Sequence, residues 1–432
     1  MSWFFYNILF AIGFVLMLPR FLLRMKKRGG YRDRFAERFG VYDPEVRARL
    51  NEGGRLWIHA VSVGEMYVAL DFIRACRGQD PAVRFVLSTV TSTGRALALT
   101  KADPADVVIY FPLDFPPIVR RALDAVKPRA LILTEGELWP NILRQCAGRG
   151  IPTGLINGRM SARSARGYKL LRPLTRQTLN GFSSILAQGP ADRDRYVALG
   201  ADVHRVEVLG SVKYDQWPDP EAANRAATVL KRIGWPPSAL ILLGGSTWPG
   251  EERALAEAYK RLKAGHPELC LVLVPRHFER AKEVAEELQE LGLKAVRRSA
   301  VTVTTVAPEV LLVDTTGELK AFYAAAHVVF VGKSLFDNHG GQNFIEPAVY
   351  GKAVITGPNL ENFPAIAADF RAASAFVQVK DVDTLFAQAD KLLGDPETRA
   401  ALGGRAAALV AKRRGVMAAT VERVLKLAGG VS

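Results

Sequence analysis

Acidic side chains follow apolar stretches in the first half of the sequence. The run Arg55–Val61 leads through Ser62 and Gly64 to Glu65, where a helix is predicted to begin. A carboxylate in this place can take a proton from a substrate hydroxyl, so Glu65 is a candidate general base, with Ser62 and Gly64 as candidate ligand contacts. A plainer interpretation is that Glu65 only complements the dipole of its helix.

A second acidic segment, TEGELWPN over 134–141, closes another apolar run. Glu135 and Glu137 occupy alternate positions, so their side chains are expected to point in opposite directions. Only one of them can then reach a substrate, while the other caps or pairs.

A basic segment, NGRMSARS over 157–164, follows the next apolar run. Its Arg159 and Ser161 suit carboxylates or phosphates of a ligand, although the segment is equally typical of a solvated turn. Lys213 stands further on, where a linker is predicted to begin, and offers a point charge to a ligand. A lone lysine in such a place is more often simply exposed.

A glycine-rich turn dominates the second half, within the stretch 331–358. Gly340 and Gly341 are expected to let the backbone approach a bound group, and the amides of the following helix suit a phosphate. Asn343 and Glu346 lie three residues apart and share one helical face, where a carboxylate can accept from both hydroxyls of a ribose. A plain loop followed by a capping box is the alternative.

Three further turns of the second half carry polar groups at predicted strand ends. Ser246 and Thr247 stand beside glycines and form a plausible phosphate cradle, without the lysine of a Walker motif. Arg276 can neutralise a phosphate or a sugar carboxylate, and 317–319 opens a helix. In a doubly wound sheet these turns converge on one place.

A metal site is not expected. The two Asp-x-Asp triplets, at 192–194 and 381–383, both fall where a helix is predicted to start, which favours capping over metal binding. The 6 histidines are not clustered, which disfavours zinc.

Length and charge set the context for these groups. The chain has 432 residues, a net charge of +15 and 49% hydrophobic residues, which indicates two globular domains and an anionic partner. Nucleic acid, an acidic membrane and a polyanionic substrate all fit that charge. The isolated Cys76, Cys146 and Cys270 favour neither a disulfide framework nor a metal site, and they suit a reducing cytoplasm.

The N-terminus narrows the choice of partner. Residues 3–18 are apolar apart from Asn7, and basic residues follow up to Arg28. A secretory signal has the reverse order, so 1–28 is predicted to be a retained membrane anchor with a basic flank. It either crosses the inner membrane, leaving the catalytic domains in the cytoplasm, or lies in the interface. A buried amphipathic helix is the alternative.

The rest of the chain alternates β-rich and helical runs, which predicts parallel sheets covered by helices. We expect two Rossmann-like domains, at 29–214 and 221–432, joined by a linker at 215–220 and facing a shared cleft. The last helix, at about 396–427, is predicted to pack back across the first domain. The predicted strands are 55–61, 83–90, 106–113, 130–134, 152–156, 184–188 and 206–210, then 240–244, 269–274, 310–314, 327–331, 353–356 and 375–379.

Together, the motifs HAVSVGE, EGELWPN, NGRMSARS, VPRHFER and GGQNFIEPA make the sequence resemble the 3-deoxy-D-manno-octulosonic acid (Kdo) transferases. These enzymes add Kdo to a lipid A precursor, and the resemblance covers nearly the whole chain. It implies an α/β fold of the two-domain GT-B type, an inverting mechanism, CMP-Kdo as donor, and neither metal nor cofactor.

The same resemblance implies roles for particular residues. Glu65 matches the proton acceptor of the family, while Glu135 and Lys213 match positions that steady the transition state. The contacts with CMP fall on Arg276, His277, Gly317, Glu318, Leu319, Asn343, Phe344, Ile345 and Glu346. The sequence departs from the family pattern at Gln342 and Trp248, where His is usual, at Gly136, where Thr is common, and at Lys333, which replaces glycine.

Two other functions fit parts of the pattern. A different membrane-bound GT-B enzyme, using a UDP-sugar and a polyprenyl-lipid acceptor, would share the same architecture. A non-catalytic membrane tether that binds nucleic acid would use the net charge. However, no basic stripe interleaved with aromatic residues is present, so no nucleic-acid partner is expected.

Overall fold

The chain folds into two compact units. The computed structural model describes residues 2–28, 33–301 and 307–429. The first unit comprises Met1–Val212 together with Gly415–Ser432, and the second comprises Lys213–Arg414. Each unit has its own parallel sheet and its own hydrophobic core.

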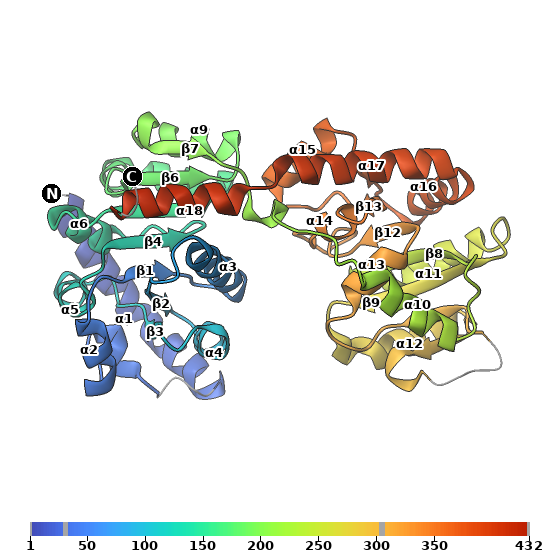
Figure 1. Cartoon of the computed structure of the whole chain (residues 1–432), viewed down its shortest axis with the longest axis horizontal. Helices are drawn as coiled ribbons and strands as arrows, with labels where there is room; N and C mark the ends of the chain where they lie inside the picture. Colours follow the sequence, from blue (N-terminus) through green and yellow to red (C-terminus); the bar gives the residue numbers. More distant parts are fainter. Residues whose placement is uncertain (1, 29–32, 302–306, 430–432) are drawn as a thin grey trace. The chain divides into compact units, whose positions relative to one another are not determined.

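The sheet of the first unit has seven parallel strands in the order β3-β2-β1-β4-β5-β6-β7 (Figure 1). Every residue of β1, β2 and β4 is buried, because helices pack on both faces of the sheet. All seven strands predicted for this half are present. They are β1 Leu56–His59, β2 Phe85–Thr89, β3 Val107–Tyr110, β4 Ala130–Thr134, β5 Thr153–Gly158, β6 Ser184–Ala187 and β7 Val206–Val208.

The helices of the first unit begin with α1 Ser2–Arg28 and end with α18, the last helix of the chain. Between them lie α2 Pro44–Asn51, α3 Val63–Gln79, α4 Ser92–Lys101, α5 Pro116–Val126, α6 Pro140–Gly148, α7 Ala162–Leu170, α8 Arg172–Leu179 and α9 Pro190–Ala198, with 3-10 turns at Phe35–Phe39 and Val203–Arg205. A third such turn, Val212–Tyr214, stands at the boundary between the units.

The sheet of the second unit has seven parallel strands in the order β10-β11-β9-β8-β12-β13-β14. The sequence predicted six of them and missed β10, a three-residue edge strand with little apolar signal. The strands are β8 Leu240–Thr247, β9 Leu269–Pro275, β10 Ala295–Arg297, β11 Val310–Leu312, β12 Val328–Val331, β13 Ala353–Thr356 and β14 Val377–Gln378.

The helices of the second unit lie around its sheet (Figure 1). They are α10 Ala222–Arg232, α11 Glu251–Leu262, α12 Ala281–Glu290, α13 Leu319–Ala325, α14 Ile345–Ala348, α15 Pro364–Ala372, α16 Val382–Gly394 and α17 Pro396–Arg413, with 3-10 turns at Phe278–Arg280 and Arg298–Ala300.

Each sheet contains one point at which the strand order reverses. In the first unit this point lies between β1 and β4, and in the second it lies between β8 and β12. Ligands of open α/β sheets bind outside the carboxyl ends of the strands at such points. The turns after these four strands are therefore where the ligand contacts of each unit are expected.

The last helical stretch is two helices rather than one. The chain breaks helix at Arg414 and Gly415, and Gly415 has a positive φ of 94° that favours glycine. Helix α17 belongs to the second unit, whereas α18 Val416–Leu427 belongs to the first, where it packs on α3 and β5.

The N-terminal helix α1 has two distinct faces. Phe10 and Phe14 pack against Phe115, with ring centroids 4.9 Å and 5.6 Å apart. The opposite face exposes large apolar side chains, namely Phe4, Ile8, Leu9, Ile12, Val15 and Leu16. In the described part of the chain, no helix combines the length and the apolar character that a membrane crossing needs. The side chains of the basic flank at 20–28 lie outside the described residues.

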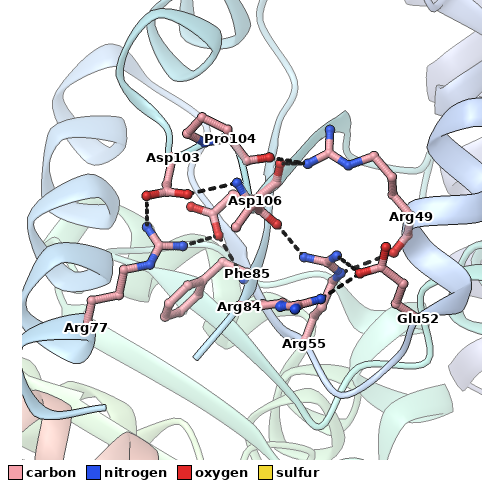
Figure 2. A network of polar contacts seen from close by, with 10 residues as sticks. Arg49, Glu52, Arg55, Arg77, Arg84, Phe85, Asp103, Pro104 and Asp106 are labelled. Carbon is pink, nitrogen blue, oxygen red and sulfur yellow. Dashed lines mark hydrogen bonds and ion pairs between the residues drawn. The ribbon is translucent and has the colours of Figure 1, made fainter. Parts of the chain in front are cut away.

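A charged network holds the amino ends of β1, β2 and β3 together, at the edge of the sheet away from the strand-end turns (Figure 2). The buried guanidinium of Arg55 donates to Glu52 Oε2 and to the carbonyl oxygen of Ala105, both at 2.7 Å. Asp106 accepts from the backbone of Phe85 and from Arg77. These charged groups therefore stabilise the fold rather than serve a site.

Candidate active site

Glu65 lies just after β1, and three donors hold its carboxylate. The side chain is 9% exposed, and Ser62 caps helix α3 by accepting from the amide of Glu65. Glu65 Oε1 accepts from the Ser62 hydroxyl at 2.9 Å, and Oε2 accepts from the amide of Val61 at 3.0 Å. Both Ser62 and Gly64 are exposed. The carboxylate is therefore oriented by its own turn, at the strand reversal of the first sheet.

Thr134, the last residue of β4, joins that strand to the same carboxylate. Its hydroxyl oxygen lies 3.0 Å from Glu65 Oε2. The predictions from sequence did not include Thr134, because the contact crosses between neighbouring strands. The sequence did offer one signal for Thr134, because a hydroxyl residue stands at the end of a buried strand that lies opposite the candidate base.

The acidic turn after β4 separates its two carboxylates. Glu135 has a positive φ of 56°, and its side chain faces Asn157 at 3.4 Å and Arg159 at 3.6 Å. Glu137 instead lies in the electrostatic field of Glu65. Burial, together with the negative charges of Glu65 and Glu135, raises the pKa of Glu137 to about 7. As the alternation predicted, one carboxylate pairs while the other approaches Glu65.

The basic segment after β5 supports this turn. Arg159, whose side chain is 33% exposed, pairs with Glu135. Ser161 is exposed and caps α7 by accepting from the amide of Ser164 at 3.0 Å. Asp192, the first residue of an Asp-x-Asp triplet, accepts from the amide of Met160 at 2.9 Å, so it holds this loop rather than capping α9.

His59 is a core residue rather than an acid or base. It is fully buried and stacks on Phe111 with ring centroids 3.7 Å apart. Burial lowers its pKa to about 3, which keeps the imidazole neutral. Its place at the end of β1 therefore supports the position of Glu65 through packing.

In the second unit, Glu251 organises the two turns at the strand reversal. This fully buried carboxylate accepts from four backbone amides at 2.8–3.0 Å. Trp248, in the turn after β8, supplies one of the four; the others are Lys333, Ser334 and Leu335, after β12. Burial raises the pKa of Glu251, while these amides lower it. All its lone pairs serve the fold, so Glu251 is a structural residue that sequence analysis did not single out.

The same turns gather candidate donor contacts. Ser246 is half-buried with a positive φ of 52°, and Thr247 is buried. The ammonium of Lys333 lies 4.6 Å from the centre of the Trp248 ring, which in turn lies 5.4 Å from the ring of His277. Two departures from the family pattern, Trp248 and Lys333, are thus in contact with each other.

Arg276 and His277 follow β9 and are exposed. Across the sheet, Asn343 Nδ2 lies 3.3 Å from Glu346 Oε1, so the two residues share a face as predicted. Burial raises the pKa of Glu346, while the charges of Lys320 and Arg276 and the bond from Asn343 lower it. Arg276 and Glu346 therefore act on one another electrostatically, although they come from different turns.

Some predicted contacts have no free side chain. Phe344 and Ile345 are fully buried in the core, so only their backbone can meet a ligand. Gly317 is exposed with a positive φ of 84°; Leu319 is half-buried, and Glu318 pairs with Arg298 at 3.0 Å.

Gly340 and Gly341 are buried rather than open to a ligand. A Cβ on Gly340 would overlap the side chain of Asn362, and one on Gly341 would lie 2.8 Å from Leu360. Internal packing and positive φ angles of 112° and 73° explain both glycines.

Lys213 lies at the first residue of the second unit. Its ammonium is 4.1 Å from the centre of the Phe363 ring, and Tyr214 beside it donates to Asp369 at 2.9 Å. No group of three or more metal-ligating side chains is present among the described residues.

Comparisons with known proteins agree with this arrangement. A family model described as 3-deoxy-D-manno-octulosonic-acid transferase (kdotransferase) matches residues 33–216. The 3-deoxy-D-manno-octulosonic acid transferase of Haemophilus influenzae is 33% identical over 96% of both chains. That of Bordetella pertussis is 36% identical over 92% of this chain and 93% of its own.

The fold agrees as well. A solved glycosyltransferase of Rickettsia africae aligns with 87% of this chain and 98% of its own, with a TM-score of 0.59 and 10% identity. The two parallel-sheet units thus resemble those of GT-B glycosyltransferases. On the identity and coverage of its relatives, the chain belongs to the family of 3-deoxy-D-manno-octulosonic acid transferases.

Proposed function

We propose that the protein is an inverting glycosyltransferase that moves Kdo from CMP-Kdo to a glucosamine hydroxyl of a lipid A precursor, at the cytoplasmic face of the inner membrane. Family membership supports the transferred sugar. Glu65 supports the chemistry, because it is an oriented carboxylate at the strand reversal of the first sheet.

In the proposed reaction the acceptor oxygen bonds to the anomeric carbon of Kdo, while the bond from that carbon to the phosphate oxygen of CMP breaks. Glu65 takes the hydroxyl proton, and CMP leaves as an anion that needs no protonation. Arg276 and the backbone amides of the second unit stabilise the phosphate charge. Glu135 and Lys213 are proposed to steady the transition state.

The first unit is proposed to lie on an anionic membrane through the exposed face of α1. The hairpin of α7 and α8 extends that surface, since α8 packs beside α1. Helix α7 has no buried residue, and Leu170 and Leu171 at its end are 85% and 52% exposed. Residues 162–180 contain no acidic residue, and their basic residues are Arg163, Arg166, Lys169, Arg172 and Arg176. Apolar tips flanked by basic groups suit the headgroup region of a bilayer.

One experiment tests the reaction. The purified protein is mixed with CMP-Kdo and a lipid A precursor, and the lipid product is weighed by mass spectrometry. Glu65→Gln is expected to lose at least a hundredfold in rate, as removal of a general base does. Asp71→Asn, an exposed change on the same helix, is the matched control. Full activity of Glu65→Gln would remove the proposed base.

A further inference from the structure

Helix α1 is hydrogen-bonded to the part of the first unit that carries the acidic turn. The hydroxyl of Tyr6 donates to Asp114 Oδ2 at 3.0 Å. The side-chain amide of Asn141 donates to Asn7 Oδ1 at 2.7 Å. These bonds join residues more than a hundred positions apart in the chain, and both lie on the face of α1 opposite its exposed apolar side chains.

Asp114 connects the helix to the start of α6. It is fully buried and accepts from the amides of Asn141 and Ile142, both at 2.9 Å. Its carboxylate thus satisfies the free amides at the first turn of α6 from a distant part of the sequence. Tyr6 supplies a third donor. Asp114 is therefore the common acceptor for a side chain of α1 and for the backbone at the start of α6.

Aromatic packing follows the same route. Phe115 contacts Phe10 and Phe14 of α1. At the other end of this short segment, Phe111 contacts Trp139 with ring centroids 5.2 Å apart and stacks on His59. The segment 111–115 consequently has α1 on one side and the acidic turn on the other.

The acidic turn is thereby fixed at both ends. It begins after Thr134, which contacts Glu65, and it ends at Asn141, which contacts Asn7 and Asp114. Glu135 and Glu137 lie between these points. A shift of α1 would move the second end while leaving the first in place.

We propose that Asn7, Tyr6 and Asp114 are positioning residues for the transfer reaction. Their hydrogen bonds hold α1 against the first unit, and in this way they determine where the carboxylates of the acidic turn lie relative to Glu65. This inference rests on the proposed function. It gives α1 a second role besides membrane contact, carried by its inner face alone.

Kinetics in detergent micelles test the inference, because saturating micellar acceptor removes any need for a bilayer. Asn7→Ala and Tyr6→Phe are each expected to lower kcat about tenfold, since small misplacements of reacting groups cost rate. The KM for CMP-Kdo is expected to stay unchanged, and each variant is expected to melt well above the assay temperature. Asn7→Asp keeps the acceptor for Asn141 and is expected to restore kcat. Because Asp114→Asn alters a buried acceptor and can impair folding, it does not carry the test.

Gln145→Ala provides the matched control. Gln145 also lies on α6, but it donates over 2.8 Å to the carbonyl oxygen of Pro116, the first residue of α5, rather than to α1. Its kcat is expected to equal that of the wild type. Full kcat in Asn7→Ala and Tyr6→Phe would overturn the inference, as would a loss that Asn7→Asp shares or one that follows the melting temperature. A wild type that transfers no Kdo would instead overturn the proposed function itself.

Discussion

The hydroxyl oxygen of Thr134 lies 3.0 Å from Glu65 Oε2, across the boundary between β4 and β1. The same oxygen lies 3.0 Å from the carbonyl oxygen of His59. Its one proton can serve either acceptor, so Thr134 can hold the ionised carboxylate of Glu65 or release it. A base that must accept a proton benefits from such a neighbour, because the hydroxyl can turn away as the carboxylate becomes neutral.

Thr134→Val is expected to lower kcat about tenfold, or about 1.4 kcal/mol in activation free energy. The valine keeps the shape of threonine but cannot donate to Glu65. Steady-state kinetics on the lipid A precursor check this, with Thr134→Ser as the control that keeps the hydroxyl. Equal rates for valine and serine at this position would contradict the role.

Glu137→Gln is expected to change how stability depends on pH. Because the pKa of Glu137 in the folded protein is raised to about 7 from its ordinary 4.5, the fold favours the neutral form. That stabilisation is complete below pH 4.5 and is lost as pH rises through 7, with a slope of at most about 1.4 kcal/mol per pH unit.

Urea unfolding of the wild type and of Glu137→Gln between pH 4.5 and 8 measures this contribution. The free energy of unfolding of the wild type should fall relative to that of the variant as pH rises. Asp71→Asn should run parallel to the wild type. Parallel curves for Glu137→Gln as well would show that Glu137 ionises normally.

Glu251→Gln is expected to destabilise the second unit by roughly 3 kcal/mol, because an amide cannot accept from four backbone donors and brings two unpaired protons of its own. Thermal or urea unfolding measures the loss. Glu257→Gln, a change at a half-exposed position on the same helix, should cost less than about 0.5 kcal/mol. An unaffected Glu251→Gln protein would show that the two turns hold without this carboxylate.

CMP is expected to raise the melting temperature, and UDP is not. At a hundred times its dissociation constant, a ligand adds about 2.7 kcal/mol of stability. Arg276→Gln should weaken this protection, whereas Arg261→Gln, whose arginine pairs with Asp383 on the surface, should not. Protection by UDP and not by CMP would instead favour a UDP-sugar transferase.

Membrane contact is tested by co-sedimentation with vesicles of anionic or zwitterionic lipid. Leu16→Asp on α1 and Leu170→Asp on the hairpin should each weaken binding to anionic vesicles roughly tenfold, since each removes a buried leucine from the bilayer. Leu99→Asp, at an exposed leucine on α4, is the control. Binding that survives both variants would place the lipid contact elsewhere.

Most strands could be predicted from the sequence because apolar runs alternate with helical ones over the whole chain. The sequence also placed Glu135 directly after a strand, and Glu65 and Glu346 in the first turns of helices, since helix starts and strand ends are local signals. The alternation of Glu135 and Glu137 correctly predicted two different environments.

The remaining features depend on contacts that no local pattern encodes. Asp114 and Glu251 serve amides far along the chain. Gly340 and Gly341 were expected to admit a ligand but instead make room for Asn362 and Leu360. The sequence predicted a single helix at the C-terminus and did not predict the break at Gly415, because the apolar periodicity continues across it.

The break at Gly415 also has a consequence for how the protein is made. The second unit is one uninterrupted stretch, Lys213–Arg414, whereas the first is completed only by α18, from the end of the chain. During synthesis, the inserted unit has emerged in full before the surrounding one receives its last helix. A chain cut just before Val416 would therefore contain the whole second unit, whereas α3 and β5 of the first unit would lack their cover.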